Sequence, residues 1–273
     1  MINANSKIAK QFWETGKLPC PILDFHAHMD EHPAIYFPAP SADDMMRSMN
    51  NFNIRWLLFS NHLSLDDPIY GEPYNVENVK KYPDRMRAYH LILPRHLDCD
   101  KIISDLEANK EYYVGCKILG DYSAFPIDDP SIFPVYQYLN DNKLFLLIHT
   151  WGGSPNNDSR HVANIAKNFP DITIIAGHTF FGRQKEGVEL CLQDPTVYFE
   201  LTAIPIVNGY LEDIVNTAGG SERILFGTDL PWFSTMHGVG MVLSADITDE
   251  DRLNIFYRNG DKLLSRFPWY KLD

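Results

Sequence analysis

This sequence of 273 residues contains no hydrophobic run long enough to cross a membrane. A membrane-spanning helix needs about 20 consecutive apolar residues, and no window of the chain approaches that length. The first residues, Met-Ile-Asn-Ala-Asn-Ser-Lys, also lack the apolar core of a secretory signal. We therefore expect a cytoplasmic protein that does not enter a membrane.

Cysteine and positive charge are both scarce. Lys and Arg number 24 against 36 Asp and Glu, which gives a net charge of -12. A protein that binds nucleic acid needs a basic face, so we expect a small-molecule substrate and no nucleic acid. The oligomeric state stays open, and a homo-oligomer is one option. The cysteines form no Cys-x-x-Cys pair, which excludes a zinc knuckle and a thioredoxin-like motif; they are Cys20, Cys99, Cys116 and Cys191.

Short apolar runs recur along the whole chain, and each is followed by a longer stretch with helical spacing. This alternation is typical of parallel βα units. Most runs are apolar on consecutive residues, as expected for strands that are covered on both faces. The eight predicted strands are residues 21–26, 54–60, 86–93, 112–119, 143–149, 172–178, 196–201 and 223–228.

Polar residues that can cap a helix precede several of the intervening stretches. Ser41, Asp129 and Asp158 each stand where a side-chain oxygen can accept hydrogen bonds from the first turn. Thr248 begins the last predicted helix, which extends to Phe267. Eight strand-helix pairs in this length predict an α/β fold, a (β/α)8 TIM barrel, for which about 250 residues is typical.

No linker, charge block or repeat interrupts the series, so we assign residues 1–273 to one domain, with residues 1–20 as a lead-in segment. A doubly wound open sheet is the alternative architecture. It should carry a glycine-rich phosphate turn after its first strand. The sequence has His26-Ala-His-Met-Asp-Glu-His at that position instead, which favours the barrel.

Five residues that can bind metal stand at the carboxyl ends of predicted strands, where active sites of such folds lie. They are His26, His28, His149, His178 and Asp229. Residues two apart in an extended chain face the same side, so both first-strand imidazoles can face the barrel axis. Closure of a barrel brings strand eight beside strand one, which would carry Asp229 to that histidine pair.

Two converging imidazoles are half of a zinc site, and a nearby carboxylate can bind metal or take a proton from metal-bound water. Each residue alone has an ordinary interpretation: a surface His-x-His, a hydrogen-bonded core histidine or an aspartate that begins a turn. Their shared placement favours a metal site. The other histidines are assigned to loops or structural roles, with His62 and His96 as candidates for pocket lining; they are His32, His62, His90, His96, His161 and His237.

The sequence resembles the amidohydrolase superfamily, and more closely its amidohydrolase-related branch (amidohydrolase 2) of metal-dependent hydrolases and decarboxylases. The resemblance spans nearly the whole chain. The fragments that carry it are Leu23-Asp-Phe-His-Ala-His, Gly115-Cys-Lys-Ile, Leu147-Ile-His, Ala176-Gly-His, Phe226-Gly-Thr-Asp-Leu-Pro-Trp and Ile255-Phe-Tyr-Arg-Asn-Gly-Asp-Lys-Leu-Leu.

The resemblance implies that His26, His28 and Asp229 hold one divalent metal, usually zinc and commonly with His149. His178 would then touch the substrate or polarise metal-bound water. In members with two metals, a carboxylated lysine at the position of Lys117 bridges the ions, and the histidines of strands five and six bind the second one. Alternatively, the Lys117 ammonium neutralises a substrate carboxylate or pairs with a neighbouring acid. We take Asp229, His178 and Lys117 as the candidate catalytic residues.

The sequence is compatible with three functions. The first is hydrolysis of an amide, lactone or similar bond by metal-activated water. The second is non-oxidative decarboxylation of a small aromatic or unsaturated acid, and the third is a barrel without catalytic function. Candidate contacts for a planar or carboxylated substrate lie in the loops after the strands; they are Trp151, Trp232, Phe233, Tyr122, Phe125, Arg95, Arg160 and Arg183.

Overall fold

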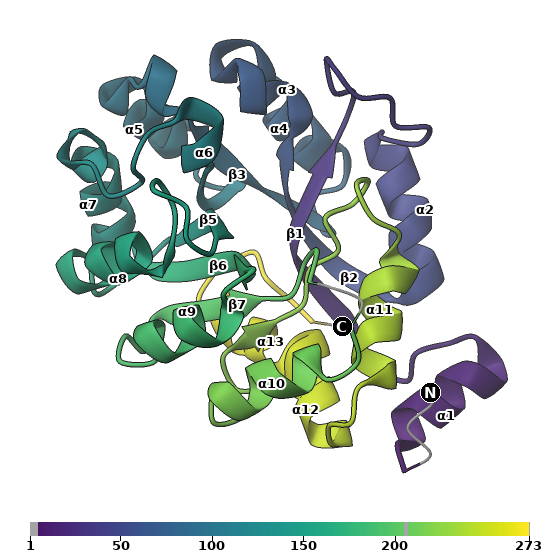
Figure 1. Ribbon diagram of the computed structural model, residues 1–273. Coiled ribbons are helices and arrows are strands. Elements are labelled where there is room, and N and C mark those ends of the chain that lie inside the picture. The colour runs from purple at the N-terminus through teal and green to yellow at the C-terminus, as the bar shows by residue number, and fades with distance from the viewer. Residues whose placement is uncertain (1–4, 205–206, 273) are drawn as a thin grey trace.

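Eight parallel strands follow one another around one sheet in the order β1 to β8 (Figure 1). The computed structural model describes residues 5–204 and 207–272. The helices lie around the outside of the sheet, so the predicted (β/α)8 barrel in a single domain is confirmed (Figure 1). The strands are β1 Ile22–Met29, β2 Ile54–Asn61, β3 Met86–Ile92, β4 Tyr113–Ile118, β5 Phe145–Trp151, β6 Thr173–Phe181, β7 Val197–Glu200 and β8 Ile224–Leu225.

The barrel is closed between β1 and the residues that follow β8. The last strand is regular over two residues only, shorter than the predicted 223–228. Beyond it, the amide of Phe25 donates to the Phe226 carbonyl at 2.9 Å, and the amide of His28 donates to the Leu230 carbonyl at 2.5 Å. Irregular backbone therefore completes the ring that a longer strand would otherwise close.

Helices occupy the segments between the strands, and the predicted caps are present. The Ser41 hydroxyl accepts the Asp44 amide in a capping box, and Asp158 accepts the Arg160 amide. None of the helices in the described residues is both long and apolar enough to span a bilayer. The α-helices are α1 Lys7–Thr15, α2 Ala42–Phe52, α3 His62–Asp66, α4 Pro68–Lys81, α5 Cys99–Ala108, α6 Gly120–Ser123, α7 Phe133–Asp141, α8 Ser159–Asn168, α9 Gln184–Cys191, α10 Tyr210–Thr217, α11 Thr235–Ser244, α12 Asp249–Leu253 and α13 Asn259–Leu264.

The last predicted helix begins at Thr248 as expected, where the Thr248 hydroxyl accepts the Asp251 amide. It then continues through a π-helical turn, η3 Asn254–Arg258, into α13. Two short 3-10 turns, η1 Pro94–His96 and η2 Pro130–Ile132, precede α5 and α7. Asp129 caps the second of these turns by accepting the Ser131 amide.

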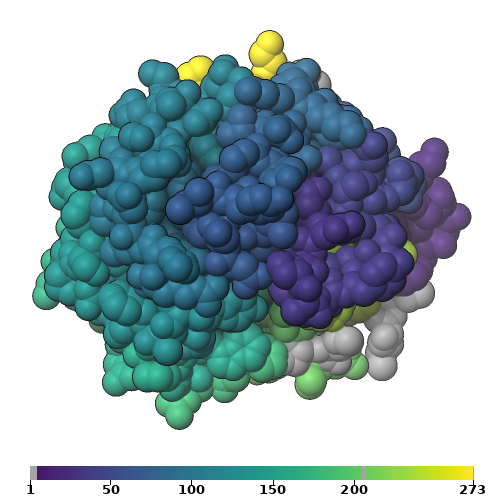
Figure 2. Space-filling model, turned by 90° about the horizontal axis from the view of Figure 1, so that it is seen from above, coloured from purple at the N-terminus to yellow at the C-terminus, as the bar shows by residue number. Residues whose placement is uncertain are grey.

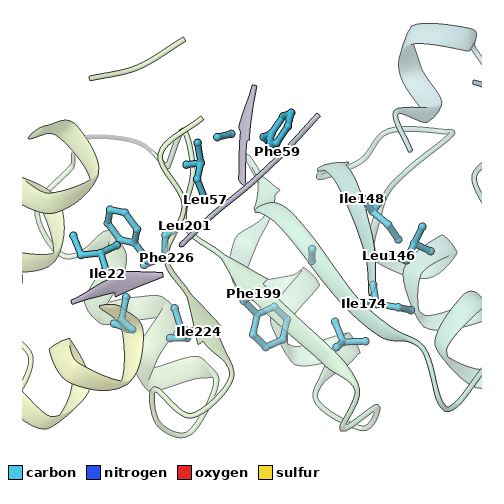
Figure 3. Close-up of a cluster of buried hydrophobic side chains, with 14 of the residues drawn as sticks. Ile22, Leu57, Phe59, Leu146, Ile148, Ile174, Phe199, Leu201, Ile224 and Phe226 are labelled. Atoms are coloured by element: carbon cyan, nitrogen blue, oxygen red, sulfur yellow. The ribbon is translucent and has the colours of Figure 1, made fainter. Parts of the chain in front are cut away.

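Alternate residues of each strand enter two different apolar clusters. On β5, Leu146 and Ile148 pack in the layer between strands and helices, which Figure 3 shows. Phe145 and Leu147 belong to a second cluster, which fills the barrel interior toward the amino ends of the strands. His149 continues this inward series one step toward the carboxyl end, because residues two apart share a face. The same alternation that builds the core therefore turns site residues inward.

A buried carboxylate ties the two sides of the closure together. Asp24 is fully buried and accepts hydrogen bonds from the Thr228 amide at 3.1 Å and the Thr228 hydroxyl at 2.6 Å. The Thr228 hydroxyl also accepts the Leu230 amide at 3.1 Å. One threonine side chain thus bonds two buried groups at the seam, the line along which β1 meets the residues after β8.

Thr228→Val should lower the free energy of unfolding by about 2 kcal/mol, because the valine leaves a buried carboxylate and an amide without this partner. Urea unfolding at neutral pH measures the change. Thr15→Val, at the exposed end of α1, is the matched control and should change stability by less than about 0.5 kcal/mol. Equal effects of the two substitutions would show that this contact does not secure the closure.

Candidate active site

The six residues predicted to form the site lie together at the carboxyl end of the barrel strands. Five of them are buried and His149 is partly exposed. Lys117 on β4 lies 2.8 Å by its Nζ from the Nε2 atoms of both His26 and His28 on β1. Asp229 Oδ1 lies 3.4 Å from each of these two ring nitrogens. Chain segments about 200 residues apart thus converge as the barrel closure requires.

The two β1 histidines turn the same ring nitrogen toward this centre. His26 Nδ1 lies 2.8 Å from a Glu200 carboxylate oxygen, and His28 Nδ1 lies 3.2 Å from the Ser60 carbonyl. The Lys117 ammonium can only donate, so each Nε2 accepts from it with its lone pair and each Nδ1 carries the ring proton. Burial, with a smaller contribution from the Lys117 ammonium, lowers the pKa of both histidines, so the rings stay neutral.

A compact set of three donor groups fits a divalent cation. Donor atoms of His26, His178 and Asp229 lie within 4.8 Å of one another, the only such set of three or more found among the described residues. Neutral imidazole nitrogens and a carboxylate oxygen are ligands that zinc and related transition metals accept. The Lys117 ammonium, held between two inward ring nitrogens, already occupies the place of a cation. The residues present therefore fit the expected metal.

His149 and His178, both among the predicted ligands, differ in their position relative to the donor set. His178, on β6, joins the three-donor set, whereas His149 on β5 does not. His178 Nδ1 donates to the Thr202 carbonyl at 3.1 Å, and its Nε2 lies 3.0 Å from His149 Nδ1. The two histidines therefore form one hydrogen-bonded pair in which His178 lies nearer to Asp229.

Asp229 and Lys117 have pKa values that lie closer together than those of an ordinary acid and base. Burial raises the pKa of Asp229 to about 6, against the opposing effect of the Lys117 ammonium. Burial lowers the pKa of Lys117 to about 8, while the carboxylates of Asp229 and Glu200 raise it. A carboxyl group with such a pKa can carry a proton near neutral pH.

The backbone of two donor residues, Asp229 and His178, lies in the left-handed region of φ. Asp229 has φ 56°, and the run His178, Thr179 and Phe180 has φ 64°, 44° and 55°. Such angles are costly for non-glycine residues, above all for a β-branched one. The Thr179 hydroxyl donates to the Glu200 carbonyl at 2.7 Å and helps to hold this conformation. Strain concentrated at donor residues is typical of functional sites.

Aromatic rings flank the donor set on the β5 side. His149 and Trp151 stack in parallel with centroids 5.5 Å apart and planes 5° apart, and Tyr122 lies 5.9 Å from His149. Trp151 and Tyr122 remain exposed, whereas the donor atoms behind them are buried. Trp151 and Tyr122 thus pack against a residue of the site, and their predicted contact with a substrate stays a prediction.

His62, a candidate for pocket lining, packs directly on the site. Its ring stacks on His28 with centroids 5.1 Å apart and on Phe37 at 4.9 Å. Its Nδ1 donates to the Asp30 carbonyl at 2.7 Å and its Nε2 accepts the Trp232 indole N–H at 3.0 Å. Both nitrogens are engaged, so His62 supports the loops rather than moving protons. Figure 2 shows the purple segment before α2 beside the blue segment that includes α3 and α4.

Three arginines and His96 have neighbours other than the donor set. Arg160 pairs with Asp158 at 2.7 Å, and Arg183 lies 3.8 Å from Glu186; both side chains are exposed. Arg95 donates to the Asp66 carbonyl at 3.2 Å. His96 lines a cavity of about 490 Å³ between α4 and α5, on the outside of the barrel. These four residues follow strands in the sequence, but that position alone does not bring their side chains to the donor set.

His90, assigned to a structural role, lies buried in the wall of that outer cavity. Its Nε2 is 3.4 Å from an Asp105 carboxylate oxygen and 4.0 Å from one of Glu72. Burial lowers the pKa of His90, but the two carboxylates outweigh it and hold the pKa above its usual range. The protonated ring therefore stabilises the folded protein.

His90→Asn should cost more stability in acid than in alkali. A raised folded-state pKa gives stability that is fully present below the unfolded value of about 6.5 and lost as pH rises through the folded value. Urea unfolding of wild type and variant from pH 5.5 to 9 measures the difference. A difference that stays constant over this range, or grows with pH, would contradict the charged pairing.

Glu200 belongs to the site although the sequence interpretation did not include it. It ends β7, contacts His26, and lies at the carboxyl end of an apolar strand like the predicted residues. The rule that selected the histidines would also have selected this glutamate. A preference for histidine, aspartate and lysine as ligands left it out.

The sequence model of the amidohydrolase family matches residues 73–266. No curated protein sequence matches the chain. Similar solved structures include 2,6-dihydroxybenzoate decarboxylase from Rhizobium, with 16% identity and a TM-score of 0.69 over 89% of this chain and 99% of that one. Another is 5-carboxyvanillate decarboxylase from Sphingomonas paucimobilis, with 13% identity and a TM-score of 0.68 over 90% and 99% of the two chains.

A third similar structure is a dihydroxybenzoic acid decarboxylase from a Polaromonas species with bound manganese and 2-nitroresorcinol. It shares 17% identity and has a TM-score of 0.69 over 92% of this chain and 99% of that one. At these identities the likeness concerns the fold.

Proposed function

Since this chain belongs to the amidohydrolase family, we propose that it is a metal-dependent decarboxylase that acts on a small aromatic or unsaturated acid. The observation that carries the proposal is the position of Asp229, a buried carboxyl group of raised pKa that belongs to the same donor set as His26 and His178, at the end of the barrel where the rings of His149 and Trp151 stack. Decarboxylases are among the similar folds, which makes this activity the first to test.

His26, His178 and Asp229 would hold the cation, and His28 would lie beside it. A bound divalent cation supplies Lewis acidity that orients and polarises a carboxylate or hydroxyl oxygen of the substrate. The Lys117 ammonium, which lies 2.8 Å from His26 Nε2, would leave that nitrogen when the cation binds and could then face a substrate carboxylate. Nitrogen-rich donors suit zinc, and one similar structure contains manganese. We propose one ion of either metal per chain.

Asp229 would act as the proton donor. As the bond between the ring carbon and the carboxylate carbon breaks, its electron pair stays on the ring carbon and carbon dioxide leaves. The proton of the Asp229 carboxyl group forms the new C–H bond, and the carboxylate then regains a proton from solvent. The parallel rings of His149 and Trp151 offer a surface for a planar substrate.

Hydrolysis of an amide or lactone is the second candidate function. The observation that favours it is the complete set of four histidines, Asp229 and Lys117 at one end of the barrel, which also satisfies the arrangement implied for hydrolases with one or two metals. In this case Asp229 would collect a proton from water and return it to the leaving group.

Carbon dioxide release separates the two candidates. The purified protein, loaded with zinc or manganese, would be incubated with a panel of hydroxybenzoates, other unsaturated acids, simple amides and lactones. Carbon dioxide formed from an acid supports decarboxylation, whereas turnover of amides or lactones alone supports hydrolysis. Elemental analysis of untagged protein tests the metal count: a value near one agrees with the proposal, and values near two or zero contradict it.

A further inference from the structure

We propose that Glu200, at the end of β7, is a positioning residue that fixes the ring of His26 for metal binding. The proposal rests on the metal centre proposed above and assigns a role to a residue outside the expected ligands. Glu200 itself would not bind the ion. It would act through His26, whose other ring nitrogen faces the donor set.

Glu200 is fully buried, and its carboxylate is surrounded by donors. One oxygen lies 2.8 Å from His26 Nδ1 and accepts the His178 amide at 3.3 Å. The other accepts the Thr202 amide at 2.6 Å and the Thr202 hydroxyl. The His178 amide belongs to β6, and the Thr202 amide and hydroxyl belong to the segment after β7. These three donors hold the carboxylate in one orientation.

This orientation decides which nitrogen of His26 can bind a cation. Both Glu200 oxygens already accept hydrogen bonds, and the Lys117 ammonium lies on Nε2. The ring proton of His26 therefore stays on Nδ1 beside Glu200, and the Nε2 lone pair points to Asp229 and Lys117. A hydrogen bond to a carboxylate also makes an imidazole a stronger ligand and fixes its ring plane. The pair therefore prepares the ligand before any ion is bound.

Two motif glycines have no conformational reason to be glycine, and their close neighbours provide a steric one. Neither Gly177 nor Gly227 has a positive φ. A Cβ at Gly227 would lie 2.1 Å from a Glu200 carboxylate oxygen and 2.5 Å from the Thr202 hydroxyl. A Cβ at Gly177 would lie 2.9 Å from the Ile148 carbonyl oxygen and 3.2 Å from His26 Cε1. Gly227 thus leaves space for Glu200, whereas the neighbouring β5 backbone is the first reason for Gly177.

The test is the affinity of the metal-free protein for zinc and manganese, measured by competition with a chromophoric chelator. Glu200→Gln should weaken affinity by about 10- to 100-fold, the usual cost of losing such a partner. Glu72→Gln is the matched control, because Glu72 is another buried glutamate, accepts three hydrogen bonds and lies outside the site. It should leave metal affinity unchanged even where it lowers thermal stability.

A spectroscopic measurement separates positioning from a purely structural role. In metal-free wild type, the 15N shifts of the His26 ring should show a proton on Nδ1. In Glu200→Gln they should show a larger share of the Nε2–H form. Thr202→Val is a milder variant that keeps the backbone donor and removes one donor to the carboxylate; it should weaken metal affinity by several-fold, in case Glu200→Gln does not fold.

The outcomes distinguish the two proposals. Wild type that binds neither metal would overturn the metal centre, and with it the reason for this role. Wild type that binds metal, with unchanged affinity in Glu200→Gln, or in Thr202→Val where the former does not fold, would overturn the role of Glu200 and leave the metal centre standing. An equal loss of affinity in Glu72→Gln would also overturn it.

Discussion

Asp229→Asn should lower kcat for decarboxylation by about 10³-fold, within the range that a positioned proton donor usually contributes. Asparagine keeps the shape of the side chain and an oxygen that can face His26 and His28, but it has no carboxyl proton to deliver to carbon. The measurement is single-turnover carbon dioxide release with the best substrate of the panel, at saturating metal.

Metal content must be measured in the same samples, because Asp229 is also a proposed ligand. A loss of turnover at full metal occupancy would assign the effect to the proton. Asp141→Asn, at the exposed end of α7 where the Asp141 carboxylate accepts the Gln137 side-chain amide, is the control and should keep wild-type turnover. If Asp229→Asn retains more than about a tenth of wild-type kcat at full occupancy, Asp229 is not the proton donor.

Replacing His26 and His28 together by asparagine should remove the bound ion and lower turnover by more than about 10³-fold, since the ion supplies most of the charge stabilisation. The two rings provide the inward nitrogens nearest to Lys117 and Asp229. Elemental analysis of the purified variant measures the loss directly. The metal should not return on dialysis against zinc or manganese.

His161→Asn is the control for this double variant. His161 lies on α8, pairs with Asp128 at 2.6 Å and has no contact with the donor set. It should keep the metal content and turnover of wild type. A double variant that still carries wild-type amounts of metal would refute the assignment of these histidines, and one that loses metal but keeps turnover would refute a metal-dependent mechanism.

Most of the barrel was predictable because buried parallel strands appear in sequence as continuous apolar runs. All eight runs became strands, and the caps at Ser41, Asp158 and Thr248 are present. The last strand is the exception, because residues after Leu225 bond to β1 through irregular backbone. Hydrophobic pattern records burial and does not record which backbone groups pair.

The site could be located from sequence, but its internal arrangement could not. Residues at strand ends must meet at one end of a barrel, so the meeting of His26 with Asp229 follows from topology. Which nitrogen of each ring faces inward depends on acceptors such as Glu200 and Ser60, which only coordinates reveal. The position of an exposed loop side chain such as Arg160 depends on a local partner, here Asp158. The order of the strands does not specify such partners.

The seam between β1 and the residues after β8 has a consequence for the order in which the protein can form during synthesis. His26 and His28 leave the ribosome early, whereas Asp229 emerges about 200 residues later, at a translation rate of roughly 5–20 residues per second. The nascent chain therefore carries exposed imidazoles for at least about ten seconds before their carboxylate partner exists. Any chain released before residue 229 would lack the seam and the ion-binding set alike, so premature termination should yield no partially active product.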